Sequence, residues 1–298
     1  MGTPDFAVPS LVQLAENYQV KGVITQPDRP SGRGRKLVPP PVKETAHSLG
    51  LEIFQPKDTN EDPSLEKIKS WDPDLICVAA YGQILRPPLL TLPRFGCINV
   101  HASLLPRWRG ASPINAAILN GDKESGVTIM KMGPGLDDGP ILNQKTVEIR
   151  PDETAGSLSD RLANLGGELL IETIPLFIEG KIDPQIQDKS LATYAHLLKK
   201  QTGELNFEES AITLALKVRA FSPWPGTFTF WHKSRLIIHQ VRAKDVTSPG
   251  VGVFTKYEGY PAIGTRKGVL VLDIIQLAGK KKVNGIEFLN GTPDWEIN

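Results

Sequence analysis

The sequence predicts an α/β fold with a doubly wound, mostly parallel sheet, followed by a smaller β-rich domain. Between residues 8 and 100, apolar patterns of helical and strand period alternate, which is typical of parallel strands joined by helices. Residues 74–81 form an almost continuous apolar run, as expected of a strand buried on both faces. From residue 227 onward, short strand-like runs alternate with Gly- and Pro-containing turns, which indicates a small β-barrel.

The individual elements follow from the spacing of the apolar residues. In the first part, helices are expected at residues 9–18, 40–49, 62–70, 112–120 and 157–179, and strands at 19–25, 51–54, 74–81, 97–101, 126–132 and 141–149. In the second part, a helix at 211–221 precedes strands at 227–231, 236–241, 252–255, 262–265 and 269–276. These two groups of elements predict two different domains.

A polar, helix-poor stretch separates the two groups of elements. It extends over residues 180–208 and contains one short structured segment at 194–198. We therefore expect an α/β domain at residues 1–189, a linker at 190–206 and a β-rich domain at 207–298. A chain of 298 residues is long enough to give each domain its own core.

The overall composition is that of a globular protein. Hydrophobic residues make up 40% of the chain and charged residues 22%, and no apolar run reaches the length of a membrane span. The two cysteines, Cys77 and Cys97, both lie in apolar runs. This placement favours buried thiols in a reducing compartment over a disulfide or a metal site.

The charge is unevenly distributed, although its total is only +1. Residues 1–190 contain 20 Lys and Arg against 24 Asp and Glu, whereas residues 191–298 contain 14 against 9. A basic C-terminal segment indicates a polyanionic partner, but a solvated basic face explains the charge equally well.

The first six residues, Met-Gly-Thr-Pro-Asp-Phe, have the pattern of a turn after a strand and the start of a helix. No strand-like run precedes them in the sequence. We therefore expect the first strand of the sheet to be missing and the natural start of the chain to lie upstream of residue 1.

The strongest candidate for chemistry is the pair Asn99 and His101, at the end of an expected strand. Side chains two residues apart on a strand point to the same face, and open α/β sheets bind ligands at strand ends. A lone histidine on a strand is more often structural, but the shared face and the loop that follows favour a site. An amide donor beside a group that holds a proton suits chemistry on a carbonyl.

A second candidate is the loop at residues 133–140, which contains three glycines, two prolines, Asp137 and Asp138. The two aspartates fit ordinary turn positions. Alternatively, one of the carboxylates holds and polarises His101, which would raise the pKa of the imidazole and fix its ring.

A third candidate is the basic, Gly-containing segment at residues 26–37. Residues 21–43 contain six Lys and Arg against one Asp, and the segment is too polar to pack in a core. It is either a surface loop or an arm that lies on phosphate. Neither a Walker loop nor the GxGxxG dinucleotide fingerprint is present here.

Together these segments resemble the methionyl-tRNA formyltransferase family over essentially the whole chain. The matching segments are Gly2–Phe6, Gln26–Leu37, Val78–Gly82, Asn99–His101, Ser103–Gly110, Gly126–Met130, Leu136–Gly139 and Phe221–Pro225. Asn-x-His, Ser-Leu-Leu-Pro and Leu-Asp-x-Gly resemble motifs of formyltransferases that use 10-formyltetrahydrofolate. The Gln-Pro-Asp-Arg-Pro loop and the Trp-Pro motif resemble those of the tRNA-specific members.

The resemblance implies a role for each matching residue. It implies a catalytic triad of Asn99, His101 and Asp137. It implies folate contacts at Tyr81, Ile84, Leu85, Ser103, Leu104, Leu105 and Pro106. It implies tRNA contacts at Arg29, Arg33, Arg35 and Lys36. It also implies that the C-terminal domain is an OB-like tRNA-binding domain.

The activity implied is transfer of the formyl group of 10-formyltetrahydrofolate to the α-amino group of initiator methionyl-tRNA, for translation initiation. The expected partners are that tRNA and the folate, with no metal, no membrane and a monomeric chain. The expected location is the cytoplasm, or an organellar matrix or stroma if a targeting segment precedes residue 1.

Two other functions compete with this one. The first keeps the folate and the triad but transfers the formyl group to water, a nucleotide or a nucleotide sugar. The basic segment at 26–37 and the basic C-terminal domain disfavour it. The second is a tRNA-binding protein with an inactive site. The intact set of Asn99, His101 and Asp137 disfavours this one, because a pure binder has no use for it.

Overall fold

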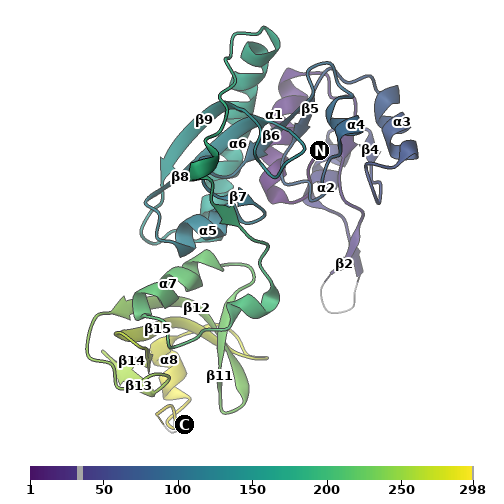
Figure 1. Cartoon of the computed structure of the whole chain (residues 1–298). Helices are drawn as coiled ribbons and strands as arrows, with labels where there is room; N and C mark the ends of the chain where they lie inside the picture. The colour runs from purple at the N-terminus through teal and green to yellow at the C-terminus, as the bar shows by residue number, and fades with distance from the viewer. Residues whose placement is uncertain (32–35, 297–298) are drawn as a thin grey trace. The chain divides into compact units, whose positions relative to one another are not determined.

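The computed structural model describes residues 1–31 and 36–296. The chain divides into two compact units, which we describe separately (Figure 1). The first unit comprises residues 1–113, 124–148 and 159–195, and the second comprises residues 114–123, 149–158 and 196–298. Two of the residues expected to contact tRNA, Arg33 and Arg35, lie outside the described residues.

Short parallel strands form the sheet of the first unit, and two longer antiparallel strands extend it. The strands are β1 (Val23–Ile24), β4 (Ile53–Phe54), β5 (Ile76–Val78), β6 (Cys97–His101), β8 (Glu124–Lys131) and β9 (Ile141–Glu148). Strand β1 pairs with β4 and β5 pairs with β6 in parallel, whereas β6, β8 and β9 pair antiparallel. The predicted parallel strands are confirmed. The sequence did not predict that β8 pairs antiparallel with both β6 and β9.

Helices lie at each position where apolar spacing predicted one in this part of the chain. They are α1 (Val8–Asn17), α2 (Pro41–Ser48), α3 (Asp62–Ser70), α5 (Pro113–Leu119) and α6 (Ala155–Ile178), with the unpredicted short helix α4 (Pro87–Leu90) and the 3-10 turns Asp5–Ala7, Lys189–Leu191 and Lys200–Gly203. Helices α1 to α4 each have proline in the first or second position. Proline is well placed there because its missing N–H is one that the first helical turn leaves unpaired.

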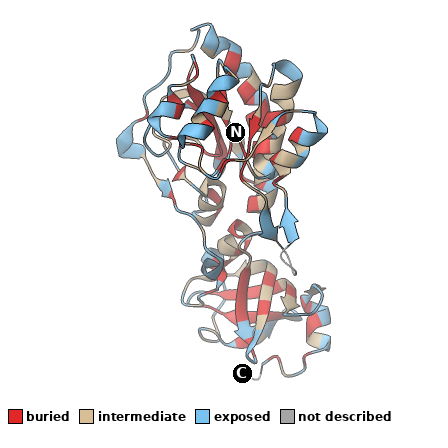
Figure 2. Ribbon diagram, turned by 90° about the vertical axis from the view of Figure 1, so that its right-hand side faces the viewer, coloured by how far each residue is buried: buried red, intermediate tan, exposed pale blue. Residues whose placement is uncertain are grey.

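The part of the second unit that follows residue 210 is an antiparallel sheet with two helices. Its elements are α7 (Ala211–Ala220), β11 (Thr227–Trp231), β12 (Ser234–Lys244), β13 (Phe254–Tyr257), β14 (Tyr260–Gly264), β15 (Val269–Leu277), β16 (Val283–Asn284) and α8 (Gly285–Asn290). The strands pair in the order β11-β12-β15-β14-β13, and β16 pairs with β15. Their apolar side chains form a core around the fully buried Trp295, and buried residues follow the strands in Figure 2.

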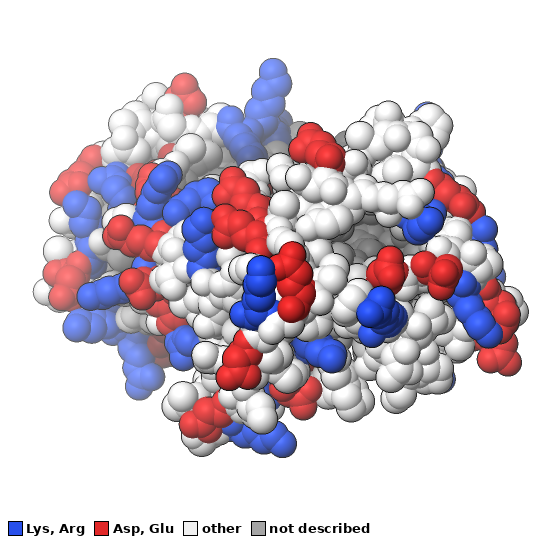
Figure 3. Space-filling model, turned by 90° about the horizontal axis from the view of Figure 1, so that it is seen from above, with Lys and Arg blue, Asp and Glu red and all other residues white. Residues whose placement is uncertain are grey.

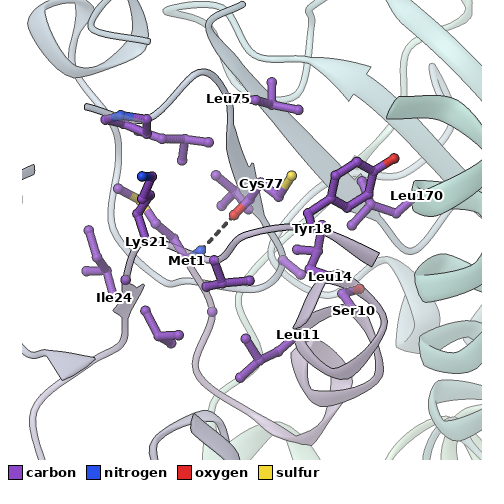
Figure 4. Close-up of a pocket in the computed structure, with 18 of the residues that line it drawn as sticks. Met1, Ser10, Leu11, Leu14, Tyr18, Lys21, Ile24, Leu75, Cys77 and Leu170 are labelled. Atoms are coloured by element: carbon purple, nitrogen blue, oxygen red, sulfur yellow. Dashed lines mark hydrogen bonds between the residues drawn. The ribbon is translucent and has the colours of Figure 1, made fainter. Parts of the chain in front are cut away.

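The sheet of the first unit is interrupted between β1 and β5. At one end of the gap, the Gly2 N–H donates to the carbonyl of Ile24 (3.0 Å), and the Ala79 N–H donates to the carbonyl of Met1 (2.9 Å). The Met1 ammonium also donates to the Cys77 carbonyl (2.6 Å), a contact that the dashed line in Figure 4 marks. Apart from Met1 and Gly2, no described strand lies between β1 and β5. Within the described residues, β1 with β4 and β5 with β6, β8 and β9 therefore form two separate sheets.

The basic segment contains a hairpin that the sequence did not predict. Strand β2 (Arg29–Ser31) pairs antiparallel with β3 (Lys36–Val38). At the base of the hairpin, the Asp28 carboxylate accepts hydrogen bonds from Gln55 (2.8 Å) and Lys43 (2.8 Å). These bonds, with that of Gln55 the larger contribution, lower the pKa of Asp28. The hairpin thus has a well-defined base, in place of the expected loop.

Three further features concern the cysteines, the longest helices and the charge of the surface. Both cysteines are free thiols, and desolvation by burial raises the pKa of Cys77 and of Cys97 to about 12. Within the described part of the chain, no helix is both long and apolar enough to cross a membrane. On the face seen in Figure 3, basic and acidic side chains are interspersed, in keeping with the small total charge.

Candidate active site

Strand β6 positions Asn99 and His101 on one face of the sheet. All five residues of this strand are buried, and alternation places residues 99 and 101 together, away from Ile98 and Val100. In register, Asn99 lies opposite Met130 of β8 and His101 lies opposite Thr128. Their exposed fractions are 9% and 6%. The structure therefore brings together the two side chains that the spacing had predicted to share a face.

The ring of His101 is held between a carbonyl and a carboxylate. Its Nε2 lies 2.9 Å from the carbonyl oxygen of Trp108, and its Nδ1 lies 3.8 Å from Asp137 Oδ2. A carbonyl oxygen only accepts hydrogen bonds, so Nε2 carries a hydrogen and donates it. The Nδ1 contact is longer than a hydrogen bond but within the distance of an ion pair. The ring orientation therefore directs Nδ1 toward Asp137.

Asp137, and not Asp138, is the aspartate beside His101. Its Oδ2 accepts a hydrogen bond from the Gly110 N–H (2.8 Å), and its backbone has a positive φ of 47°. Gly139 ends the loop where a Cβ atom would overlap the carbonyl oxygen of Lys131. Only glycine fits that position, so the turn that presents Asp137 depends on it. The loop residues alone left the choice between the two aspartates open, the resemblance implied Asp137, and Asp137 is the one that lies beside His101.

The Asp137 loop is held by a residue that sequence reasoning missed, Gln187. Its Nε2 donates to the carbonyls of Asp137 (2.9 Å) and Gly139 (2.7 Å). Its Oε1 accepts from Nε (3.0 Å) and Nη2 (2.8 Å) of Arg109. Both side chains are only 4% exposed. Gln187 lies in the polar stretch after α6. The residues around it do not predict its role, because its hydrogen-bond partners are distant in the sequence.

The loop between His101 and β7 (Arg109–Gly110) is also fastened to the end of the first unit. Strand β7 pairs in parallel with β10 (Tyr194–Ala195). The Thr193 hydroxyl accepts a hydrogen bond from the Trp108 N–H (2.9 Å), whose carbonyl holds His101. Residues 193–195 were expected to belong to a linker, and they instead contribute to the surroundings of the site.

The carboxamide of Asn99 is unused. No described residue forms a hydrogen bond with its side chain, although it lies in a largely buried position. The Asn99 amide is not one of the fully enclosed side-chain atoms without a partner, so it still reaches solvent. A donor of this kind, beside His101 and Asp137, is available to a ligand.

The expected folate residues fall into two groups. In the first, Tyr81 and Leu85 are packed in the hydrophobic core, and the Tyr81 hydroxyl lies 3.2 Å from Thr59 Oγ1. Ile84 between them is 80% exposed. A ligand in this region would therefore contact the side chain of Ile84 and the backbone. It would not contact the buried Tyr81 ring or the buried Leu85 methyl groups.

The second group, Ser103, Leu104, Leu105 and Pro106, forms a turn directly after His101. Thr128 on β8 fixes this turn by accepting from the Leu105 N–H (3.2 Å) and donating to the Ser103 carbonyl (2.6 Å). Gln144 on β9 donates to the Leu105 carbonyl (2.8 Å). Sequence reasoning missed Thr128 and Gln144, which hold the turn next to the candidate triad.

The two described residues expected to contact tRNA lie on the hairpin. Arg29 on β2 donates to the Gln26 side chain (3.2 Å), and Lys36 on β3 is exposed. The structure does not bring them into contact with the triad. Within the described residues, no cluster of His, Cys, Asp and Glu is suited to hold a metal ion.

Two family models match the chain. One, described as formyl transferase, covers residues 1–174, and the other, described as the C-terminal domain of formyl transferase, covers residues 197–293. With the α/β fold of the first unit and the antiparallel sheet of the second, these matches define the class of this protein as a formyl transferase.

Similar curated proteins narrow the class of formyl transferases to one family. A methionyl-tRNA formyltransferase from Geobacter sulfurreducens is 44% identical over 98% of this chain and 92% of its own length. One from Marinobacter nauticus is 43% identical over 100% of this chain and 98% of its own length. The chain belongs to the family of methionyl-tRNA formyltransferases, as its motifs predicted.

Solved structures with the same fold include more distant proteins. The sugar 3N-formyl transferase WlaRD, solved in the presence of dTDP and 5-N-formyl-THF, has a TM-score of 0.67 at 20% identity, over 94% of this chain and 97% of its own. HypX from Aquifex aeolicus in complex with tetrahydrofolic acid has a TM-score of 0.59 at 18% identity, over 83% of this chain and 43% of its own. At these identities the likeness concerns the fold alone.

Proposed function

We propose that this protein transfers the formyl group of 10-formyltetrahydrofolate to the α-amino group of initiator methionyl-tRNA. The observation that carries the proposal is the unused carboxamide of Asn99 beside His101 and Asp137, in a chain that is at least 43% identical to methionyl-tRNA formyltransferases over nearly its full length. The proposal includes the monomeric state and cytoplasmic location that the resemblance implies.

The reaction begins with attack of the amine on the formyl carbon. The amine must be unprotonated, and free α-amino groups titrate near pH ~8, so a useful neutral fraction exists at neutral pH. Attack converts the formyl oxygen into an oxyanion. Asn99 donates its unused amide hydrogen to this oxygen, and one such donor lowers the barrier by roughly 3 kcal/mol.

His101 and Asp137 act on the charge that develops. Because Nε2–H is engaged by the Trp108 carbonyl, the ring contributes through its positive charge when protonated. The Asp137 carboxylate, whose Oδ2 lies 3.8 Å from Nδ1, accepts the proton of the amine through a water molecule. The bond from the formyl carbon to N10 then breaks, N10 takes up a proton, and the products are formylmethionyl-tRNA and tetrahydrofolate.

The folate is proposed to lie along the turn after His101. Thr128 and Gln144 hold the Ser103 and Leu105 carbonyls and the Leu105 N–H in place, which prearranges this surface before the ligand binds. Exposed Ile84 supplies an apolar contact at the other side of the proposed folate position. A prearranged turn limits the entropy lost when the folate binds.

A formyl transfer assay with competing acceptors tests the function. With 10-formyltetrahydrofolate, we expect methionyl-tRNA to gain the mass of one formyl group in place of a hydrogen, detected by mass spectrometry of the charged tRNA. Glycinamide ribonucleotide, a nucleotide sugar and buffer alone should gain no formyl group above background. Formylation of either small acceptor at a comparable rate, or of none of the acceptors, contradicts the proposal.

The hairpin is proposed to contact the phosphates of the tRNA through its basic residues. We expect Lys36→Ala to raise KM for methionyl-tRNA roughly fivefold and to lower the slope of log(kcat/KM) against log[salt] by about one, because one phosphate contact is lost. Steady-state kinetics at several salt concentrations measures both quantities.

Lys69→Ala is the matched control for this variant. Lys69 is an exposed lysine on α3 whose nearest acidic partner, Glu66, lies 4.0 Å away. We expect its KM and salt slope to equal those of the unmodified protein. Equal behaviour of the two variants would exclude a tRNA contact at Lys36.

A further inference from the structure

Two buried side chains, Arg109 and Gln187, connect strand β7 to the loop that carries Asp137. Both are only 4% exposed, and Nε and Nη2 of Arg109 lie 3.0 and 2.8 Å from Gln187 Oε1. On the other side of the same amide, Gln187 Nε2 donates to the carbonyls of Asp137 (2.9 Å) and Gly139 (2.7 Å). The amide thus lies between a guanidinium and two backbone carbonyls.

The chemistry of these partners fixes the orientation of the Gln187 amide. A guanidinium only donates hydrogen bonds, and a carbonyl only accepts them. The side chain between them must therefore accept on one side and donate on the other, which a carboxylate, an ammonium or a hydrocarbon chain cannot do. The contacts use both lone pairs of Oε1 and both hydrogens of Nε2, so the hydrogen-bonding capacity of the amide is complete.

Arg109 is also joined directly to the residue that binds the Asp137 carboxylate. Gly110, which follows it in β7, donates its N–H to Asp137 Oδ2 (2.8 Å). The contacts therefore close into a ring that runs from the Asp137 carboxylate through β7 and Gln187 back to the Asp137 carbonyl. Consecutive residues of β7 thus hold Asp137 at its side chain directly and at its backbone through Gln187.

Asp137 requires such restraint because its backbone conformation is unfavourable. Its φ of 47° lies in the left-handed region, which costs free energy for a residue other than glycine and persists where surrounding contacts enforce it. In this conformation Oδ2 lies 3.8 Å from Nδ1 of His101. Without the Gln187 bonds the Asp137 backbone can relax, and the carboxylate then turns away from His101.

We infer that Gln187 and Arg109 are positioning residues for formyl transfer. Gln187 fixes Asp137 opposite His101, and Arg109 fixes the Gln187 amide. Both act through Asp137 and not by touching the substrate. The inference rests on the proposed function, because the role of Asp137 in transfer is part of that proposal.

Gln187→Glu tests the inference with a change of one group. The carboxylate still accepts from Arg109, but it cannot donate to the carbonyls of Asp137 and Gly139. We expect kcat for formylation of methionyl-tRNA to fall by at least about fivefold, because misplaced reacting groups slow the chemical step. KM for the tRNA should stay within about twofold, because no tRNA contact is removed. Gln185→Glu is the matched control: it makes the same change on an exposed side chain, and its kcat should be normal.

Two further variants remove the contacts without adding a negative charge. Gln187→Met has a similar length and forms none of the bonds, so its kcat should fall by at least about fivefold as well. Arg109→Met leaves Oε1 without its donors, so the amide can rotate, and kcat should fall by at least about threefold. A normal kcat in either Gln187 variant overturns the role of Gln187, and a normal kcat in Arg109→Met overturns that of Arg109.

A double-mutant cycle distinguishes positioning from a general loss of structure. In the Asp137→Asn background, Gln187→Glu should slow transfer by less than about a further twofold, because both changes act through the same carboxylate. A merely structural role predicts the same loss in both backgrounds, and that result overturns the inference.

Hydrogen exchange at the Gly110 amide gives a readout that needs no substrate. This amide donates to Asp137 Oδ2, so we expect it to exchange at least about tenfold faster in Gln187→Glu. The Gly264 amide of the second unit, bonded to the Val253 carbonyl (2.8 Å), should exchange at its normal rate. Unchanged exchange at Gly110 overturns the inference, whereas an unmodified protein that does not formylate methionyl-tRNA contradicts the proposed function instead.

Discussion

Asn99→Ala is expected to lower the rate of formyl transfer in a single turnover by more than a hundredfold, which corresponds to roughly 3 kcal/mol. The lost interaction is a hydrogen bond to the oxyanion, which exists only after the amine has attacked. Equilibrium binding of tetrahydrofolate should therefore change by less than about threefold, because ground-state binding does not use this bond. Rapid-quench kinetics with methionyl-tRNA and excess enzyme measures the transfer step directly.

Stability distinguishes this role from a structural one. Because no described residue bonds to the Asn99 side chain, its removal should leave Tm within about 2 °C of the unmodified protein. Asn17→Ala is the matched control: its amide, exposed at the end of α1, donates to the Gln13 carbonyl (2.8 Å), and its loss should leave transfer unchanged. A near-normal rate for Asn99→Ala would exclude the proposed role of Asn99.

His101→Ala is expected to reduce single-turnover transfer by a similar factor of more than a hundred, because the charge that faces the developing oxyanion is lost. His101→Gln separates charge from positioning. Its amide can still donate to the Trp108 carbonyl, but it carries no charge, so we expect its rate to stay close to that of the alanine variant. Recovery to within about tenfold of the normal rate would show that the ring serves only to hold the turn.

Asp137→Asn provides a further comparison at the same site. An asparagine side chain keeps an oxygen acceptor for the Gly110 N–H, so the loop should retain its geometry. The Asp137→Asn substitution removes the negative charge opposite His101 Nδ1. We expect transfer to slow by at least about tenfold with Tm nearly unchanged. Unchanged transfer would contradict the assigned role of Asp137.

Much of the fold could be predicted because its elements have long, regular apolar patterns. Strands β6 and β11 lie at the predicted residues, since a buried strand requires a continuous or alternating apolar run. The hairpin β2–β3 was missed because its charged and Gly-rich sequence resembles a loop. The antiparallel direction of β8 was also unpredictable, because periodicity reports which residues are buried and not which way a strand runs.

The candidate site was predictable to the extent that its groups are local. Asn99 and His101 are two residues apart on a strand, so the alternation of side chains alone places them together. Asp137 could be chosen over Asp138 only by resemblance, because the residues and their spacing alone left that choice open. Gln187 and Thr193 were not found, because their partners are 48 to 85 residues away in the chain.

Gln187 and Thr193 fix the Asp137 loop and the Trp108 turn, so the order in which residues are synthesised affects when the site can form. The ribosome makes Asn99, His101 and Asp137 well before it makes the residues that fasten the Asp137 loop and the Trp108 turn. A nascent chain that ends before residue 187 therefore has the reacting groups but not the restraints that align them. We therefore expect competence for catalysis only after the segment through Ala195 has been made and has paired with β7.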